Sequence, residues 1–196
     1  MQPLHGLVVC GGQSSRMGTD KSLIRYHEEP QWLHTASLLS NLCENISISC
    51  HKEQVSQFAG RFPVIADLPE YSGFGPIGAL LTIWAYHPRA SLLVVGCDYP
   101  LLTMDDLQSL VNSRVEGEYG ICFQSNDSIE PLIAVYEMSI KEIVQKAFQQ
   151  GKYSLKHILG EHGVRTVSSK IPGNIVSADS PEKARQIMEI IARSKH

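Results

Sequence analysis

The sequence lacks the features of several large classes of protein. Its 196 residues carry 17 Lys and Arg against 20 Asp and Glu, which gives a formal net charge of −3, and no run of five like charges occurs. Proteins that bind nucleic acids or membrane surfaces usually carry a basic footprint, and this chain has none. We therefore expect neither partner, and we expect any bound anion to be held by local geometry.

Cysteine and histidine are not arranged as in disulfide-rich or zinc proteins. The five cysteines are odd in number and show no CxxC spacing, and the eight histidines form no HExxH motif. The N-terminus lacks the charged and apolar regions of a signal peptide. The most apolar helical stretch, residues 77–86, is shorter than the roughly 20 residues that span a bilayer. Together these absences favour a reduced, cytoplasmic protein.

What the sequence does contain is an alternation of short β-type runs with segments of helical periodicity. The predicted strands are residues 4–9, 46–50, 63–66, 91–96, 119–124, 131–136 and 164–168, and the predicted helices are residues 30–42, 52–59, 76–86, 139–150 and 154–159, with a capping box at 103–106 and a last helix opened by Ser180-Pro181. No repeat or linker interrupts the pattern. We predict one domain, residues 1–196, with a three-layer, Rossmann-like α/β fold and a mostly parallel sheet covered on both faces.

Two unusual loops follow the first and fourth predicted strands. One begins with "VVCGGQSSRMGTDKS" and the other is "GCDYP". In a doubly wound sheet, ligands collect at the carboxyl ends of the strands around the point where the strand order reverses. With the strand order 3-2-1-4 these loops lie side by side, so the pattern predicts a single site between them.

The opening loop has the composition of a phosphate-binding segment. Gly11-Gly12 lets the backbone approach a ligand closely, Arg16 offers a planar fork for phosphate oxygens, and Lys21 adds a mobile charge. It is not a P-loop, because Met17 stands where GxxxxGK[ST] needs glycine, and GxGxxG is absent too. The alternative is a solvated connector. Two cations directly after a first strand favour phosphate binding.

Two carboxylates stand at the ends of predicted strands. Asp98 is a candidate ligand of Mg²⁺ if phosphates bind beside it. Mg²⁺ commonly takes one or two carboxylates and completes its shell with phosphates and water. Asp67 is a candidate to accept hydrogen bonds from a base or a ribose. The alternative for both is a turn or capping aspartate, which is common at strand ends.

These motifs resemble the molybdenum cofactor guanylyltransferase (MobA) family. "VVCGGQSSRMGTDKSL" resembles its LAGGxSxRMGxDK signature, "GCDYP" its CDxP segment, "FGPIGAL" its GPLAG loop, "EPLIAVY" its xPLxAxY strand and "SADSPEKA" its NxNTPEDL segment. The matches run in order from residue 4 to residue 184. The resemblance implies a nucleotidyltransferase fold and the transfer of GMP from GTP to molybdopterin-bound molybdenum, with release of pyrophosphate.

The resemblance also implies roles for individual residues. Arg16, Lys21 and Asp98 are the expected catalytic residues, and Asp98 is the expected Mg²⁺ ligand. The expected nucleotide-binding residues are Val9, Cys10, Gly11, Gly12, Lys21, Ser49, Asp67 and Asp98. The implied substrates are GTP and molybdenum-molybdopterin. The implied protein partners are molybdoenzyme maturation proteins, which the protein would contact transiently.

The chain departs from the family pattern at a few positions. Val9-Cys10 replaces Leu-Ala, Ser49 stands where many members have a nucleotide-contacting asparagine, and Ser177 and Asp179 replace the two asparagines of NxNTP. The change at Ser177 predicts the loss of a polar contact to metal or substrate. The resemblance thus specifies the nucleotide more closely than the acceptor.

Two other functions stay open at this point. One is a cytidylyltransferase of the same superfamily acting on molybdopterin or on a sugar or alcohol phosphate. The Gly11-Gly12 pair favours guanine over cytosine in the family pattern. The other is a non-catalytic nucleotide-binding protein, against which the joint presence of Arg16, Lys21 and Asp98 argues.

Overall fold

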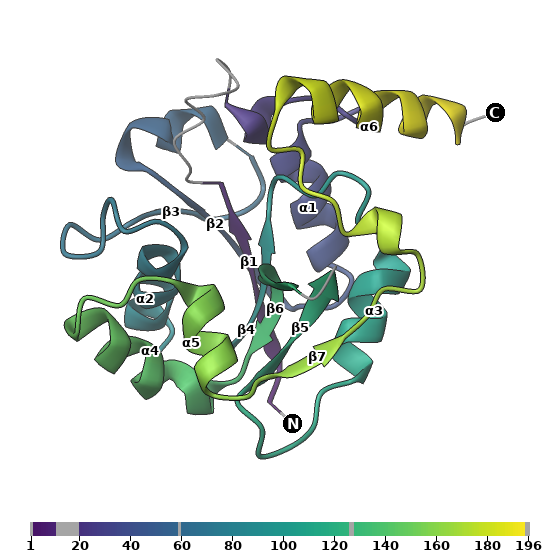
Figure 1. The fold of residues 1–196 in the computed structure, drawn as a ribbon. Helices are drawn as coiled ribbons and strands as arrows, with labels where there is room; N and C mark the ends of the chain where they lie inside the picture. The colour runs from purple at the N-terminus through teal and green to yellow at the C-terminus, as the bar shows by residue number, and fades with distance from the viewer. Residues whose placement is uncertain (1, 11–19, 59, 126–127, 195–196) are drawn as a thin grey trace.

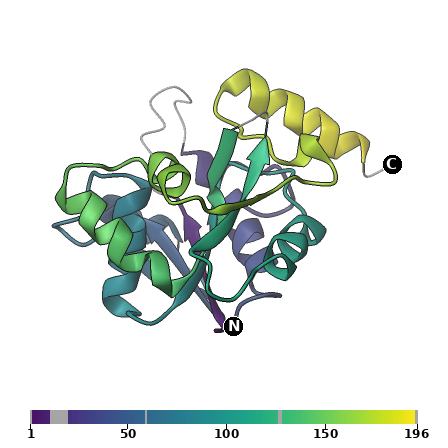
Figure 2. The same ribbon diagram turned by 60° about the horizontal axis from the view of Figure 1, so that its bottom comes forward.

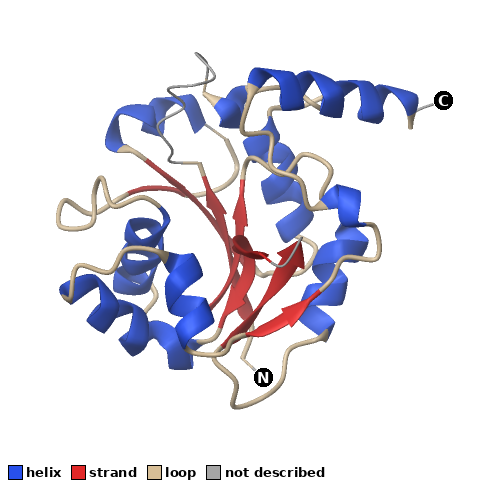
Figure 3. Ribbon diagram, in the orientation of Figure 1, coloured by secondary structure: helices blue, strands red, loops and turns tan. Residues whose placement is uncertain are grey.

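A single seven-stranded sheet forms the centre of the computed structural model, which describes residues 2–10, 20–58, 60–125 and 128–194 (Figures 1 and 3). The strands are β1 (Leu4–Val9), β2 (Asn45–Cys50), β3 (Val64–Ala66), β4 (Ser91–Gly96), β5 (Gly120–Ser125), β6 (Ser128–Tyr136) and β7 (Arg165–Val167). Their order is β3-β2-β1-β4-β6-β5-β7. β1 pairs in parallel with β2 and β4, β2 with β3, and β5 with β7, whereas β6 runs antiparallel to β4 and β5. The predicted order 3-2-1-4 and the mostly parallel sheet are confirmed.

The central strands are apolar because both of their faces are covered. Every residue of β1 and of β4 is buried, as expected for parallel strands between two layers of helices. Successive side chains point to opposite faces: Val8 and Val95 belong to one core cluster, and Val9 and Val94 belong to the other.

Helices cover the two faces and one end of the sheet (Figures 1 and 2). The helices are α1 (Gln31–Leu39), α2 (Pro76–Tyr86), α3 (Met104–Asn112), α4 (Lys141–Gln149), α5 (Leu155–Glu161) and α6 (Pro181–Arg193), with 3₁₀ turns η1 (Lys21–Leu23), η2 (Lys52–Phe58), η3 (Met138–Ile140) and η4 (Pro172–Asn174). α1 and α3 pack on one face, and α2, α4 and α5 on the other. α6 lies across the end of the sheet on a small apolar core of its own. Within the described residues, no helix combines the length and apolar character that crossing a membrane requires.

Several helix starts follow from the capping residues predicted in the sequence. Gly75 is the N-cap of α2, with φ 68°, and a proline follows it. Thr103 caps α3 in a reciprocal capping box with Asp106. Ser180 caps α6 by accepting a hydrogen bond from the amide of Lys183. These three starts are confirmed.

Most predicted boundaries agree with the structure to within two residues, and three elements differ in helix type or by three residues at one end. Residues 52–59 are predicted as a short helix of unspecified type, and the structure has the 3₁₀ helix η2 there. α1 ends at Leu39, whereas the sequence predicts a helix to residue 42. The side chains of Ser40 and Asn41 donate hydrogen bonds to the carbonyl of Ser37 and so compete with the backbone bonds of a longer helix.

The third difference is the start of β6, which precedes the predicted strand 131–136 by three residues. The sequence predicts a strand start at Pro131, yet this residue lies inside β6. The register with β5 shifts here, from Cys122 paired with Ala134 to Phe123 paired with Glu130. Proline is tolerated at such an irregularity because no ladder bond from its nitrogen is needed.

Candidate active site at the carboxyl edge of the sheet

The carboxyl ends of β1 and β4 lie next to each other at the edge where the sequence predicts the site (Figure 1). Val9, the last residue of β1, pairs with Ser49 of β2 and with Gly96 of β4. The amide of Cys10 donates to the carbonyl of Ser49 at 2.9 Å, and the amide of Cys97 donates to the carbonyl of Val9 at 3.2 Å. These bonds extend the parallel pairing beyond the strands, so the two unusual loops start side by side.

The same bonds limit what the backbone of Cys10 can offer to a ligand. Its amide hydrogen is already engaged by Ser49, so the carbonyl is the backbone group that remains for a ligand, and a carbonyl accepts hydrogen bonds from N–H or O–H groups. This suits a base or a ribose better than a phosphate. Gly11, Gly12 and Arg16, to which the sequence assigns phosphate binding, lie outside the described residues.

Asp98 is held in a defined orientation just beyond β4. Its half-buried carboxylate accepts a hydrogen bond from the Ser177 hydroxyl, with 2.6 Å between Oδ2 and Oγ. Its carbonyl accepts the amide of Ala178 at 2.8 Å. A Cβ atom added to Gly96 would lie 2.8 Å from Asp98 Oδ1 and 3.3 Å from Leu132 Cβ. Only glycine therefore leaves room for this carboxylate position.

Ser49 and Asp67 form a polar pair at the ends of β2 and β3. The Ser49 hydroxyl donates to Asp67 Oδ1 at 3.1 Å, and the Asp67 amide donates to the carbonyl of Cys50 at 3.2 Å. Burial raises the pKa of Asp67 above its ordinary value, against the hydrogen bond from Ser49 and the nearby His51, which act in the opposite direction. The second carboxylate oxygen is suited to accept a donor from a ligand.

Lys21 begins η1 directly after the opening loop, and its neighbour Asp20 fixes that turn. Asp20 Oδ1 accepts the amide of Ser22 at 3.0 Å and its hydroxyl at 2.6 Å. Asp20 Oδ2 accepts the side-chain amide of Gln54 from η2. The anchoring of the loop's end by Asp20 and Gln54 was missed in the sequence, although an Asp-x-Ser start of a turn was a visible signal for Asp20.

Lys21 also lies within electrostatic range of the segment before α6. The pKa of Asp179 is lowered first by its hydrogen bond with Lys183, whose ammonium lies 2.9 Å away, and further by Lys21. Lys21 and Asp179, which are far apart in the sequence, thus lie in the same region of the fold.

Cys10 and Cys97 are neighbours, because each directly follows one of the paired strands β1 and β4. Both thiols are free and buried. Burial raises the pKa of Cys10 well above its ordinary value, and the hydrogen-bonded contact with Cys97 raises it further. A thiol held in its neutral form is a poor nucleophile, which favours a packing role for Cys10, and both Cys10 and Cys97 belong to the core cluster under α1 and α3.

A second carboxylate flanks Asp98 on the β6 side. The Tyr99 hydroxyl donates to Glu130 Oε2 at 2.9 Å. Burial raises the pKa of Glu130, the Tyr99 hydrogen bond and Lys156 oppose this, and Asp98 raises it further. Glu130 is therefore a half-buried, hydrogen-bonded acid near Asp98. The contact with Tyr99 could not be read from the sequence.

The chemistry of these donors is compatible with a Mg²⁺ ion that is shared with a nucleotide. No group of three or more His, Cys, Asp or Glu side chains that could hold a metal occurs among the residues that the structure describes. A protein-only cage is not required, because Mg²⁺ usually keeps several waters and binds through one or two carboxylates plus substrate phosphates. Asp98 supplies one such carboxylate, held in place and half-buried.

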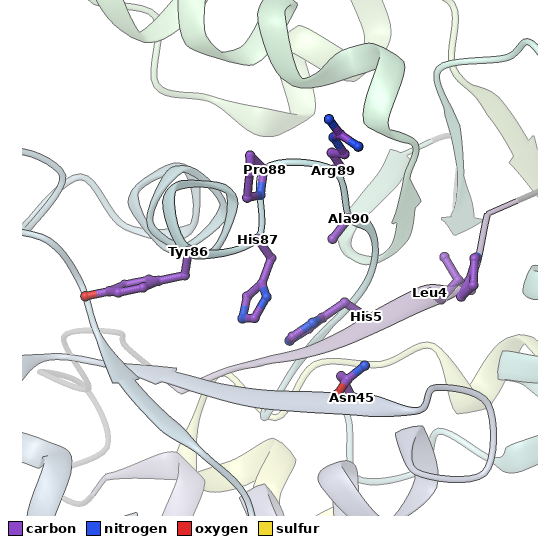
Figure 4. Close-up of a pocket in the computed structure, with 9 residues that line it drawn as sticks. Leu4, His5, Asn45, Tyr86, His87, Pro88, Arg89 and Ala90 are labelled. Carbon is purple, nitrogen blue, oxygen red and sulfur yellow. The ribbon is translucent and has the colours of Figure 1, made fainter.

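A separate pocket of about 370 Å³ lies at the opposite, amino end of the same strands (Figure 4). It is lined by His5, Asn45 and the turn after α2. The rings of His5 and His87 face each other with centroids 4.5 Å apart, whereas the side chain of Arg89 points away from them. None of the residues predicted for the site lines this pocket.

Comparison with known proteins identifies the same family as the sequence motifs. The family model of the MobA-like NTP transferase domain matches residues 6–167. A probable molybdenum cofactor guanylyltransferase of Bacillus cereus (strain B4264) is 29% identical over 174 residues, which cover 87% of this chain and 86% of the relative. A molybdenum cofactor biosynthesis bifunctional protein of Synechocystis is 28% identical over 191 residues, covering 94% of this chain but 54% of that protein.

A solved structure supports the fold. The molybdopterin-guanine dinucleotide biosynthesis protein A of Archaeoglobus fulgidus superposes with a TM-score of 0.80 at 19% identity, covering 97% of this chain and 100% of that one. At this identity the likeness establishes the architecture alone.

Proposed function

Because the chain belongs to the MobA-like NTP transferase domain family, we propose that it transfers GMP from GTP to the molybdenum-molybdopterin cofactor and releases pyrophosphate. The observation that carries the proposal is the position of Asp98. Its half-buried, anchored carboxylate lies just beyond β4, beside the end of β1 from which the glycine-containing loop departs. This position supports a cation ligand next to the start of the proposed phosphate-binding loop.

The reaction needs positioning and charge neutralisation more than a general base. An oxygen of the acceptor phosphate forms a bond to the α-phosphorus of GTP, and the bond from that phosphorus to the bridging oxygen breaks. The electron pair of the broken bond leaves with pyrophosphate. Because the attacking group is already an anion, no proton has to be removed, and in-line alignment with electrostatic stabilisation dominates.

We assign the charged residues of the edge to this task. Asp98 is the proposed ligand of Mg²⁺, and the cation, when bound, neutralises charge on the phosphate oxygens. Lys21, which stands at the end of the opening loop, and Arg16 within it are proposed to stabilise the charge that develops on pyrophosphate.

The nucleoside end of GTP is assigned to β2 and β3. Asp67, with one oxygen held by Ser49, and the carbonyl of Cys10 are acceptors suited to the N–H and O–H groups of a guanine base and ribose. Val9, Gly11 and Gly12 are proposed to complete this side with their backbone. The proposal also includes a cytoplasmic location and transient contacts with molybdoenzyme maturation proteins.

The direct test is release of pyrophosphate in the presence of Mg²⁺ and molybdenum-loaded molybdopterin, with GTP and CTP compared at equal concentration. We expect release with GTP, dependent on the acceptor, and formation of the guanine dinucleotide by mass spectrometry. Preference for CTP would replace the proposed donor with cytidine triphosphate. Absence of release with either nucleotide, in protein shown to be folded, would contradict the proposed function.

A further inference from the structure

The segment between η4 and α6 makes two hydrogen bonds to a residue nearly 80 positions earlier in the chain. The Ser177 hydroxyl donates to Asp98 Oδ2 at 2.6 Å. The next amide, that of Ala178, donates to the Asp98 carbonyl at 2.8 Å. Side chain and backbone of Asp98 are therefore both tied to this segment.

The opposite side of the carboxylate is restricted as well. Oδ1 lies 2.8 Å from the place where a Cβ on Gly96 would be. The carboxylate thus lies between the backbone of β4 on one side and the Ser177 hydroxyl on the other. A carboxylate has about four lone-pair directions, so one donated bond leaves the others for a cation.

The position of Ser177 is itself determined by α6. Ala178 is 1% exposed and packs in a small core with Tyr26 and the apolar face of α6. Ser180, two residues further on, caps that helix. The docking of α6 across the end of the sheet (Figure 2) therefore fixes where the Ser177 hydroxyl lies.

We propose that Ser177 is a positioning residue: its hydroxyl holds the Asp98 carboxylate in the orientation that receives the cation of a metal-nucleotide complex. The inference rests on the proposed function for the presence of that complex. Through this contact, the segment before α6 influences the affinity of the site for the cation. In this role Ser177 acts through Asp98 and not by direct contact with nucleotide or metal.

Three variants separate this role from a structural one. Ser177→Ala removes the hydroxyl but keeps the bond between the Ala178 amide and the Asp98 carbonyl. Ser177→Thr keeps a hydroxyl at the same place. Ser180→Ala is the matched control, because it removes a serine hydroxyl from the same segment, weakens the N-cap of α6 and leaves the contact with Asp98 intact.

The measurement is GTP binding by calorimetry at a series of Mg²⁺ concentrations, together with thermal unfolding of the free proteins. For Ser177→Ala we expect the Mg²⁺ concentration at half-saturation to rise about tenfold, the size of effect expected when a hydrogen bond to a charged group is lost. Ser177→Thr should stay close to wild type. Ser180→Ala should lower the unfolding temperature without changing the Mg²⁺ dependence.

Two failures can be told apart. If the wild-type protein binds GTP with Mg²⁺ and Ser177→Ala shows the same Mg²⁺ dependence, the role of Ser177 is wrong and the proposed function stands. The same holds if Ser180→Ala shifts the Mg²⁺ dependence as much as Ser177→Ala does. If the wild-type protein binds no nucleotide with Mg²⁺, the proposed function and the inference fail together.

Discussion

At the scale of single residues, the charge of Asp98 is the feature on which the proposed chemistry depends most. Asp98→Asn keeps the shape of the side chain and an acceptor for Ser177 but removes the negative charge. We expect pyrophosphate release to fall by about 10²–10³-fold, as when one electrostatic contact to a reacting group is removed, while the unfolding temperature changes little. Steady-state assays of pyrophosphate with GTP and acceptor measure the effect.

The matched control for that change is Asp105→Asn. Asp105 is an exposed residue in the first turn of α3, seven positions later in the chain, so the same change of charge occurs outside the site. Its activity should equal that of wild type. Undiminished release by Asp98→Asn would refute the assignment.

Gly96 is a second residue whose replacement should affect both the stability of the fold and GTP binding. A Cβ there would lie 2.8 Å from Asp98 Oδ1 and 3.3 Å from Leu132 Cβ, so Gly96→Ala forces the carboxylate and β6 apart. We expect a loss of about 1–3 kcal/mol in the free energy of unfolding from overpacking, and weaker GTP binding in the presence of Mg²⁺. Urea unfolding and calorimetry measure the two effects.

Gly160→Ala provides the comparison for Gly96→Ala. Gly160 is an exposed residue within α5, and an added Cβ there meets nothing within 4 Å. Alanine should raise the helix stability by up to about 1 kcal/mol and leave GTP binding unchanged. Equal binding by Gly96→Ala and Gly160→Ala would contradict the close approach of Gly96 to Asp98.

At the scale of elements, local patterns predicted which segments form strands and helices but not how distant segments meet. The start of α3 was predictable because Thr103 and Asp106 are three residues apart and cap each other. The early start of β6 was not, because Pro131 is tolerated only through the register shift that pairing with β5 creates. Pairing partners are a property of the whole sheet.

Asp106 shows how one element gains a second role through such distant contacts. Besides Thr103, its carboxylate accepts the Ser169 hydroxyl at 2.7 Å and the Asn174 amide at 2.8 Å. These contacts tie α3 to the segment that leads to Ser177. Burial alone would raise the pKa of Asp106, but the hydrogen bonds from Thr103, Ser169 and Asn174 lower it below 3.8.

Asp106→Asn should therefore destabilise the fold in a pH-dependent way. The folded pKa is below the unfolded one, so the carboxylate stabilises the fold fully above about pH 4, and this contribution is lost as the pH falls through the folded pKa. We expect a loss of about 2–3 kcal/mol at pH 7. The difference between wild type and variant should shrink below pH 4. Urea unfolding from pH 7 to pH 3 tests this, and a difference independent of pH would contradict it.

At the scale of the whole molecule, the topology of the site was predictable and its internal contacts were not. Alternation of strands and helices was enough to place the loops after β1 and β4 together, because the strand order 3-2-1-4 follows from the rules for doubly wound sheets. The bond between Ser177 and Asp98 depends on where α6 docks. The loss of a polar contact from residue 177 to metal or substrate stays a prediction, whereas the contact that the Ser177 hydroxyl makes with Asp98 was not predicted.

Two histidines in separate parts of the fold should make the free energy of unfolding depend on pH in mild acid. The pKa of His5 is lowered from 6.5 to about 4, mainly by burial and to a smaller extent by the neighbouring His87. Burial, and next His27, lower the pKa of His34 from 6.5 to about 4. His5 also contacts the Ser47 hydroxyl at 2.9 Å, and Glu29 lies 3.8 Å from His34.

Because both folded pKa values lie below the unfolded value, the unfolded chain takes up these protons first as the pH falls. The free energy of unfolding should therefore decrease between pH 6.5 and pH 4, by about 1–2 kcal/mol for each histidine between pH 7 and pH 5. This window lies above the one expected for Asp106. In the double variant His5→Gln, His34→Gln the curve should be nearly flat from pH 7 to pH 5 and should fall only below pH 4. Urea unfolding of wild type and double variant at half-unit steps of pH measures both curves, and parallel curves above pH 4 would show that other groups cause the loss of stability in mild acid.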